Sequence, residues 1–409
     1  MRRFTSIILA AVLVFSFTNA IFAEDQVVLN SRLWSRPAEQ EFVINEILKP
    51  FEEANNVKVV FQIVEDDPLL ERAQVQKESG KVTTDVVIAY CSRMSEWVAA
   101  GYVEDLTDVA ATWDDRTFSK GFDTMTIFDG QRYFVPIGAD VYLLAANKKA
   151  LPYLPEGADV QDLSWEQVVA WSIAMAEGEG EGKHAVTGVP QKALVYQYGG
   201  VILSYGGPFP KINSPEAVQA WELLTKMKNA YTPTVMTYDS PIEPMKRGEA
   251  WLTIAHNANV GDIYNSNPAQ FVIAPAPKGP AGIGSIAGTS GFAVVKGAPN
   301  KEMAIKLIEY MSRPDIQLKI AKGAGGFIPP VDESLALLGD TVQDEVIRKA
   351  LHVMNNGVLS FIPPVFGPNW GSVKLVYDEA FKELVMDKGA VDKAYLDKAQ
   401  EEIESFKVK

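Results

Sequence analysis

The first third of the chain alternates short apolar runs with segments of helical periodicity. A strand pattern at residues 27–34 (VVLNSRLW) is followed by a helix pattern at residues 41–56. The apolar positions of this helix are Phe42, Ile44, Ile47, Leu48 and Phe51. A strand at residues 57–64, a polar helix at residues 67–80 and a strand at residues 83–90 come next. This order predicts a doubly wound α/β domain with a largely parallel sheet.

Ligands of doubly wound sheets bind beyond the carboxyl ends of the strands. Residues 31–36, Asp66 and residues 90–93 follow such ends and are therefore site candidates. The side chains that we select from them are Trp34, Arg36, Asp66, Tyr90 and Arg93.

From residue 141 the pattern changes to longer helical segments, at residues 164–177, 214–231 and 244–251, separated by short strands. Ser164 with Gln167 three positions later has the spacing of a capping box, and Ser214 before Pro215 is a second helix start. The last third continues with a strand, a helix that starts at Asn300 and another at Pro314, and two closing helices.

The N-terminus has the composition of a secretory signal. Two arginines precede an apolar run that is too short to span a bilayer, and small residues end at Ala23. Residues 1–23 are predicted to be a cleaved signal peptide, and no Cys stands at its end for lipid attachment. We therefore expect a free periplasmic protein.

Composition narrows the possible partners. Without its signal the chain has 386 residues, more than one hydrophobic core usually serves, so two domains are expected. Cleavage lowers the formal net charge from −14 to −16, which argues against nucleic acid or an anionic membrane. Cys91 is the only cysteine, so the fold must rest on packing without an internal disulfide.

Four segments in this order resemble the extracellular solute-binding proteins of carbohydrate ABC transporters, the family that includes the maltodextrin-binding protein. They are TTDVVIAYCSRMSEWVAAGYVEDLTD, FDGQRYFVPIGADVYLLAANKKAL, DLSWEQVVAWSIAMAE, and GFAVVKGAPNKEMAIKLIEYMSRPDIQ with the later GGFIPP. In the second segment Ala145 and Ala146 replace tyrosines that are common in the family.

This resemblance implies the two-lobed α/β periplasmic-binding-protein fold, with doubly wound sheets joined by a three-crossing hinge. The expected N-terminal lobe comprises residues 24–136 and 286–328, and the C-terminal lobe comprises residues 137–285 and 329–409. The crossings are expected near residues 135–137, 283–287 and 326–330. Glycines gather there, at Gly138, Gly284, Gly288, Gly325 and Gly326, either as hinges or as ordinary turn residues.

A sugar cleft needs aromatic faces for the C–H faces of a pyranose and polar groups for its hydroxyls. Trp370 lies in a loop where the resemblance implies a stacking aromatic, and Asp140 and Tyr142 share a face just past the first crossing. For Asp140 a solvated loop position stays open. The remaining candidates at loops or strand ends are Tyr196, Tyr198, His256, Asn257, Thr289 and Ser290. Each of these has a packing or turn role as its alternative, and one of the two tyrosines is expected to face the core.

Other chemistries find little support. The three histidines, His184, His256 and His352, have no partner at a metal-ligand spacing, so neither a metal nor a cofactor is predicted. The glycine-rich runs do not fit a dinucleotide loop or a nucleophile elbow. The leading hypothesis is a monomeric, non-enzymatic receptor that delivers a sugar or oligosaccharide to an ABC permease. A receptor for a charged small solute, such as a polyol phosphate or polyamine, and an exported glycan-active enzyme are the alternatives.

Overall fold

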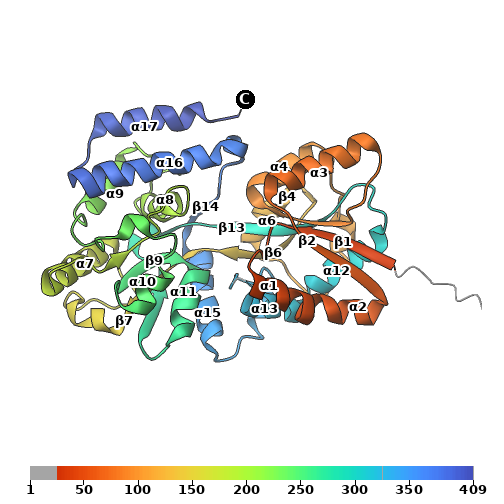
Figure 1. Cartoon of the computed structure of the whole chain (residues 1–409), viewed down its shortest axis with the longest axis horizontal. Helices are drawn as coiled ribbons and strands as arrows, with labels where there is room; N and C mark the ends of the chain where they lie inside the picture. Colours follow the sequence, from red (N-terminus) through yellow and green to blue (C-terminus); the bar gives the residue numbers. More distant parts are fainter. Residues whose placement is uncertain (1–24, 325, 409) are drawn as a thin grey trace, which may run out of the picture.

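The computed structural model describes residues 25–324 and 326–408, and the predicted signal peptide lies outside them. The protein has two α/β lobes, with strands β6 and β13 running between them (Figure 1). The first lobe contains a five-stranded sheet in the order β2-β1-β3-β13-β6. These strands are β1 (Asp25–Ser31), β2 (Val57–Ile63), β3 (Val86–Tyr90), β6 (Val135–Asp140) and β13 (Gly288–Val294).

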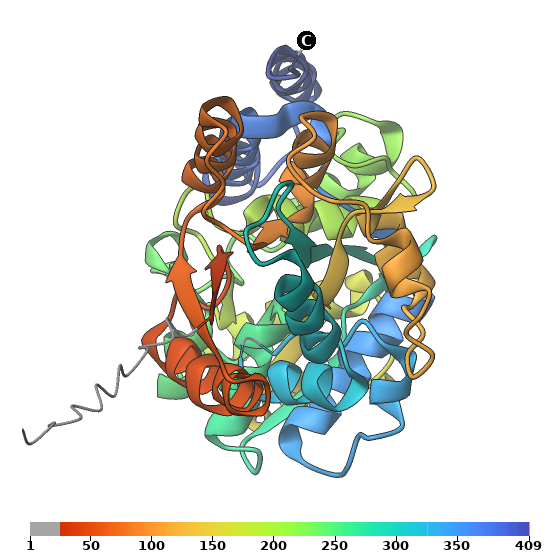
Figure 2. The same cartoon turned by 90° about the vertical axis from the view of Figure 1, so that its right-hand side faces the viewer.

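The first sheet is covered by helices on both faces, as Figure 2 shows. Alternate residues of β3 point to opposite faces: Val86 and Ile88 belong to one apolar core, Val87 and Ala89 to another. The first core contains residues of the π-helical segment Val43–Leu48, α2 (Lys49–Asn55), α12 (Lys301–Met311) and α13 (Pro314–Gly323), and the partly buried Phe42 of α1 (Pro37–Phe42) packs against it. The second contains residues of α3 (Asp66–Ser79), α4 (Cys91–Ala99) and α6 (Lys120–Thr126). The predicted doubly wound arrangement of this lobe is confirmed.

The second lobe contains a four-stranded sheet in the order β10-β7-β9-β8. Its strands are β7 (Tyr142–Asn147), β8 (His184–Ala185), β9 (Leu252–His256) and β10 (Phe271–Pro275). Its helices are α7 (Trp165–Glu179), α8 (Leu194–Ser204), α9 (Pro215–Thr225), α10 (Ile242–Arg247), α11 (Asn257–Ser266), α15 (Val342–Asn356), α16 (Trp370–Ala380) and α17 (Lys393–Ser405). The predicted caps are present, because Ser164 accepts from the backbone N–H of Gln167 and Ser214 accepts from that of Ala217.

Shorter elements complete the chain. Strands β11 (Lys278–Gly279), β12 (Gly282–Ile286) and β14 (Val358–Ser360) form a third sheet, and β4 (Ile127–Phe128) pairs with β5 (Gln131–Arg132). The short helices are α5 (Thr107–Ala110) and α14 (Asp332–Leu335). Tight or wide helical turns lie at Lys148–Tyr153, Val235–Thr237, Pro364–Asn369 and Phe381–Lys388.

Neither main sheet is wholly parallel, and the exceptions have a common cause. β1 is parallel to β2 and β3, but β13 is antiparallel to both of its neighbours. In the second sheet β7 is antiparallel to β9 and β10, whereas β8 and β9 are parallel. β7 and β13 are the strands that follow directly after a passage from the other lobe. Each therefore starts at the edge where its neighbours end.

Two of the three passages between the lobes lie later in the chain than the resemblance implied, and the second lies within the expected residues 283–287. β6 stays paired with β13 as far as Asp140, so the first passage is at Val141, after residues 135–137. The second falls between β12 and β13. Residues 329–335 lie with the first lobe, since Val331 bridges Phe118 and α14 packs against α13. The third passage is therefore between α14 and α15, later than residues 326–330.

Close packing explains two of the glycines at these passages. A Cβ on Gly288 would lie 1.9 Å from the Tyr90 hydroxyl, and a Cβ on Gly284 would lie 2.0 Å from the Gly200 carbonyl oxygen. Both distances are far below van der Waals contact. Only glycine therefore lets strand β13 approach Tyr90, and lets β12 approach helix α8, this closely.

Candidate functional site

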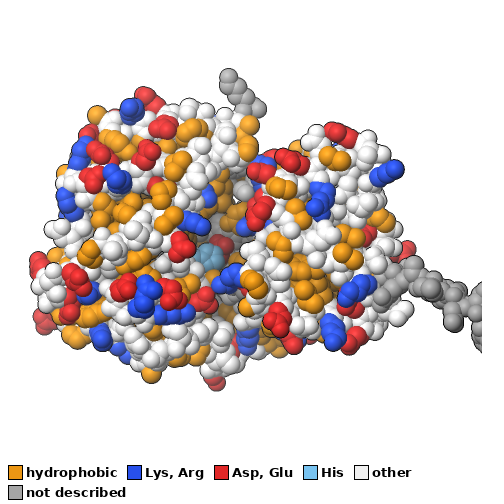
Figure 3. Space-filling view, viewed as in Figure 1, with side chains coloured by type: hydrophobic (Ala, Val, Ile, Leu, Met, Phe, Trp, Pro, Cys, Tyr) orange, Lys and Arg blue, Asp and Glu red, His pale blue; other side chains and the backbone are white. Residues whose placement is uncertain are grey.

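A cavity of about 480 Å³ lies between the two lobes, and we call it the interlobe cavity. Figure 3 shows the hollow from outside, with charged side chains around it. Its lining comes from the ends of strands in both sheets, including Tyr90 of β3, Asp140 of β6 and His256 of β9. The carboxyl ends of the strands, which the strand order predicted as the binding position, therefore line the cavity.

Ten of the predicted site residues line the interlobe cavity. They are Arg36, Asp66, Tyr90, Asp140, Tyr142, Tyr196, His256, Thr289, Ser290 and Trp370. They come from segments that are far apart in the sequence, and the folding of the two lobes brings them together.

Trp34 and Arg93 are predicted site residues that do not line the cavity. The Trp34 side chain is only 3% exposed and packs in the core of the first lobe, with its ring centroid 6.1 Å from that of Phe61. Arg93 extends along α4, where it donates to Asp67 at 2.6 Å and to Glu96 at 2.9 Å. Neither side chain is directed into the cavity, because proximity to a strand end does not fix the direction of a side chain.

Tyr198 and Asn257 also lie outside the cavity lining. Tyr198 is 1% exposed and stacks on Phe381 at a centroid distance of 5.0 Å. Asn257 is fully buried; its Oδ1 accepts from the Val141 N–H at 3.1 Å, and its Nδ2 donates to the Gly326 carbonyl oxygen at 2.5 Å. Its role is to tie the first passage between the lobes to the segment at Gly326.

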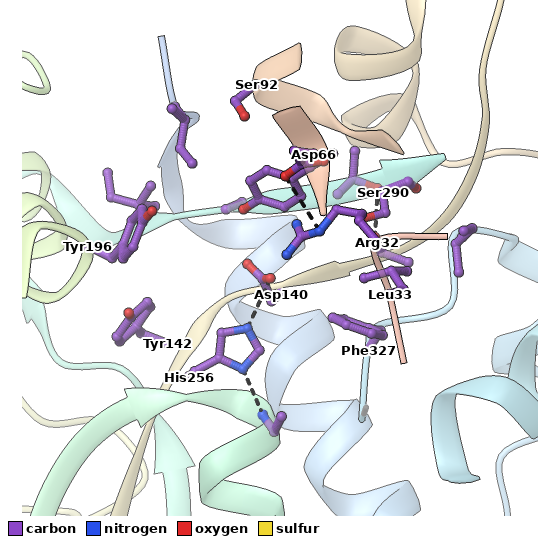
Figure 4. Close-up of a pocket in the computed structure, with 18 of the residues that line it drawn as sticks. Arg32, Leu33, Asp66, Ser92, Asp140, Tyr142, Tyr196, His256, Ser290 and Phe327 are labelled. Carbon is purple, nitrogen blue, oxygen red and sulfur yellow. Dashed lines mark hydrogen bonds and ion pairs between the residues drawn. The ribbon is translucent and has the colours of Figure 1, made fainter. Parts of the chain in front are cut away.

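Asp140 and His256 form an ordered pair in the cavity (Figure 4). Asp140 Oδ2 lies 2.9 Å from His256 Nε2, and Oδ1 accepts from the Gly288 N–H at 3.1 Å. His256 Nδ1 accepts from the Ala258 N–H at 3.1 Å, so the ring proton is on Nε2 and points to Asp140. The charge of Asp140 is thus partly satisfied within the protein, which rejects the solvated-loop alternative.

Tyr196 and Trp370 form an aromatic wall on the side of the second lobe. The Trp370 indole N–H donates to the Tyr196 hydroxyl at 2.9 Å, with ring centroids 6.2 Å apart. Phe209 and Phe366 support Trp370 from behind at 5.9 and 5.8 Å. Burial raises the pKa of Tyr196 to about 12, so its hydroxyl stays protonated. The wall is a rigid apolar face with a polar group on it.

The opposite wall combines Tyr90, Arg32 and Asp66. The Arg32 guanidinium lies over the Tyr90 ring, 4.6 Å from its centroid, and its Nε is 3.6 Å from Asp66 Oδ2. Burial raises the pKa of Asp66, although the charge of Arg32 acts in the other direction. Burial also raises the pKa of Tyr90 well above its usual value. This wall offers a charged and hydrogen-bonding surface opposite the aromatic wall.

Thr289 and Ser290 lie in the cavity floor on β13. The Thr289 hydroxyl donates to the Gly138 carbonyl oxygen at 2.6 Å, so it already has a partner that ties β13 to β6.

The sequence interpretation missed several lining residues, including Arg32, Lys374 and Phe327. Arg32 lies within the strand-end segment that was singled out, but Arg36 was chosen instead. Lys374 follows Trp370 by one helical turn, so helix periodicity would have placed the two on one face. In the described part of the chain, no group of three His, Cys, Asp or Glu side chains is placed to hold a metal ion.

Solved structures with the same architecture include three sugar-related binding proteins. Maltose-bound MalE3 of T. maritima shares 21% identity at a TM-score of 0.72, covering 93% of this chain and 99% of that one. The GacH receptor of Streptomyces glaucescens, solved unliganded and with acarbose, shares 16% at 0.73, covering 94% and 98%. The sugar-binding protein MalE of Xanthomonas citri shares 18% at 0.73, covering 93% and 97%. The two-lobed periplasmic-binding-protein fold is thereby confirmed.

No curated protein matches the chain by sequence. The family model for bacterial extracellular solute-binding proteins matches residues 46–350, which is most of the chain. The protein therefore belongs to the family of bacterial extracellular solute-binding proteins.

Proposed function

We propose that this protein is a periplasmic receptor that binds a sugar or oligosaccharide in the interlobe cavity and delivers it to an ABC permease. Its family consists of extracellular solute-binding proteins, and the similar structures include MalE3 with bound maltose and GacH with bound acarbose. Among the residues that the structure describes, no helix is long and apolar enough to cross a membrane.

The composition of the cavity walls is the observation that carries the proposal. The Tyr196–Trp370 wall presents aromatic faces, as the C–H faces of a pyranose require. Asp140, Asp66 and His256 present polar groups to the same space. A volume of about 480 Å³ is within the usual range for a small-ligand site, roughly 300–1,000 Å³. The ten lining residues predicted from sequence are the proposed ligand contacts.

The proposal also covers the closing motion of the lobes, the oligomeric state and the location of the receptor. The two lobes close over the ligand by a hinge motion, with the passages at Val141, between β12 and β13, and between α14 and α15 as hinge segments. The protein acts as a monomer and releases its ligand unchanged. Residues 1–23 are removed on export, and the mature chain is free in the periplasm.

Calorimetric titration of the mature protein against a panel of mono- and oligosaccharides tests the receptor function. Saturable binding to one group of sugars is the expected result, and mass spectrometry of the ligand that co-purifies with the protein would identify it. A panel without any binding contradicts the proposal. Incubation of the bound sugar with the protein tests the enzyme alternative: the sugar is expected back unchanged, and hydrolysis or elimination products would establish catalysis.

A further inference from the structure

Arg32 presents unused hydrogen-bond donors to the interlobe cavity. Its guanidinium is held by the Tyr90 ring at 4.6 Å and lies 3.6 Å from Asp66 on the Nε side. In the described residues, neither terminal nitrogen of Arg32 has a hydrogen-bond acceptor, and Figure 4 shows the group directed into the pocket towards Asp140. Arg32 and Asp140 do not form an ion pair. A planar fork with free donors is the geometry that receives a carboxylate in bidentate fashion.

Lys374 brings a second cation to the cavity from the other lobe. It is a half-buried residue of α16, and no carboxylate of the described chain lies within ion-pair distance of its ammonium group. Its pKa is lowered by burial, while Asp378 raises it and the positive charges of Lys192 and Arg32 lower it further. Lys374 and Arg32 thus repel each other from opposite lobes.

Each acidic residue of the lining faces a cationic or N–H group of the protein, although Asp66 Oδ1 has no hydrogen-bond partner among the described residues. Asp140 is paired with His256 and the Gly288 N–H, Glu39 is paired with Arg36 at 2.6 Å, and Asp66 faces Arg32. Three cationic and three acidic side chains line the cavity, so their formal charges cancel. The hydrogen-bond donors left without an acceptor in the described chain are nevertheless on cations, at the two terminal nitrogens of Arg32 and the ammonium group of Lys374. Such a site suits a ligand with one negative charge better than a neutral ligand or a dianion.

We propose that the ligand is an acidic saccharide, a sugar with a carboxylate such as a uronic acid unit, whose carboxylate lies between Arg32 and Lys374. This inference rests on the proposed sugar-receptor function and specifies its substrate class. The pyranose ring packs on the wall made by Tyr196 and Trp370.

The arrangement on α16 fits this placement. Trp370 and Lys374 are four residues apart on one helix face, and such neighbours have Cβ atoms about 5–6 Å apart. A ring packed on Trp370 therefore brings an exocyclic carboxylate near the ammonium group. The carboxylate also cancels the repulsion between Arg32 and Lys374, which belong to different lobes. Its binding consequently favours the closed arrangement of the lobes over the open one.

Calorimetry with matched ligands tests the inference on the mature protein. The pairs are glucuronate with glucose and galacturonate with galactose, and glucose 6-phosphate is added as a dianion. At least one acidic sugar is expected to bind about tenfold or more tightly than its neutral counterpart. Its affinity is expected to fall between about 20 mM and about 300 mM NaCl, because the pairing is electrostatic.

Two charge-removing variants locate the carboxylate. Lys374→Met and Arg32→Gln are each expected to weaken acidic-sugar binding by about tenfold or more. Lys306→Met is the matched control, since Lys306 is exposed on α12 and its substitution changes the net charge equally without touching the cavity. Thermal unfolding shows whether each variant is folded, and the Lys374 variant remains informative if the Arg32 variant is not.

The outcomes separate the two proposals. Tighter binding of the neutral member of every pair, or an acid preference that survives Lys374→Met and Arg32→Gln in folded protein, overturns the acidic-saccharide inference and leaves the sugar receptor intact. If glucose 6-phosphate binds more tightly than the uronates, the charged group of the ligand is a phosphate and not a carboxylate. This result also overturns the acidic-saccharide inference. A panel on which no sugar binds overturns the receptor function and this inference with it.

Discussion

Individual side chains in the interlobe cavity are held by protein partners before a ligand arrives. Trp370 is fixed by its hydrogen bond to Tyr196, and Asp140 by His256 and the Gly288 N–H. Fixed side chains lose little conformational freedom on binding, so more of their contact energy appears as affinity.

Trp370→Ala is expected to weaken sugar binding by about 1–3 kcal/mol, the usual scale for loss of an aromatic anchor. Trp370 is only 8% exposed and packs against Phe209 and Phe366, so the substitution also leaves a cavity and lowers the unfolding temperature. Trp370→Phe retains most of the packing and serves as the control. Calorimetry and thermal unfolding measure both effects, and an unchanged affinity in folded Trp370→Ala removes Trp370 from the site.

Asp140→Asn is expected to reduce affinity more than stability. The amide oxygen still accepts from the Gly288 N–H, so the link between β6 and β13 survives. The NH₂ group of the new asparagine, however, is a donor that faces a second donor, the N–H of His256 Nε2. The proton stays on Nε2 because His256 Nδ1 accepts from the Ala258 N–H. Titration with the identified ligand and urea unfolding compare the two losses. A larger loss of stability than of binding free energy would show that Asp140 has a structural role.

At the scale of elements, helix α16 organises one wall of the cavity. Trp370, Lys374 and Asp378 recur every four residues along it. The first two line the cavity, whereas the buried Asp378 accepts from the Gln191 N–H at 2.6 Å, just before helix α8, which carries Tyr196. Asp378 therefore joins the two helices whose side chains form the aromatic wall.

Asp378 predicts a pH dependence of stability. Burial raises its pKa to about 6 from an ordinary value of 3.8. Between about pH 4 and pH 6 the folded protein thus binds more protons at this group than the unfolded chain does, and the contribution of Asp378 to stability falls as the pH rises. Asp378→Asn lacks this titration and keeps an acceptor for Gln191.

The stability of Asp378→Asn relative to the unmodified protein is therefore expected to improve by up to roughly 3 kcal/mol between pH 4 and pH 7. Urea unfolding at several pH values measures the difference. A relative stability that is constant across this window contradicts the assigned environment of Asp378.

At the scale of the whole molecule, the two lobes are in contact through an ion pair as well as through the chain passages. Arg36 of the first lobe lies 3.4 Å from Asp262 of α11 in the second lobe. Both side chains are exposed, and such pairs contribute little, typically about 0–1 kcal/mol. A weak pair suits a receptor that must open again.

Arg36→Gln is expected to shift the unliganded protein towards a more open arrangement while leaving the liganded form unchanged. Small-angle scattering should show a larger radius of gyration without ligand and the same radius with it. Because the pair is weak, its loss alone should lower the affinity by less than about tenfold, and a larger fall reports the loss of the proposed ligand contact of Arg36. Lys319→Gln is the control, since its ion pair with Glu46 lies within the first lobe. Identical radii for Arg36→Gln and the unmodified protein in both states would contradict a role in closure.

Local sequence information determined the elements and the side of the sheets that lines the cavity. Periodicity and caps depend on neighbours along the chain, so the strands of the first lobe and the starts of α7 and α9 at Ser164 and Ser214 were predictable. Strand ends then placed Tyr90 and His256 in the cavity.

Only the tertiary structure decided which side chains point into the cavity. Tyr196 and Tyr198 lie on helix α8, where residues two apart point to nearly opposite sides, so one lines the cavity and the other packs in the core. Trp34 packs into the first-lobe core, while Arg32, two residues earlier, lies over Tyr90. The sequence by itself therefore determined the receptor fold and its binding edge. The set of side chains lining the cavity, and the cations that face each other in it, depend on contacts between lobes that no local pattern encodes.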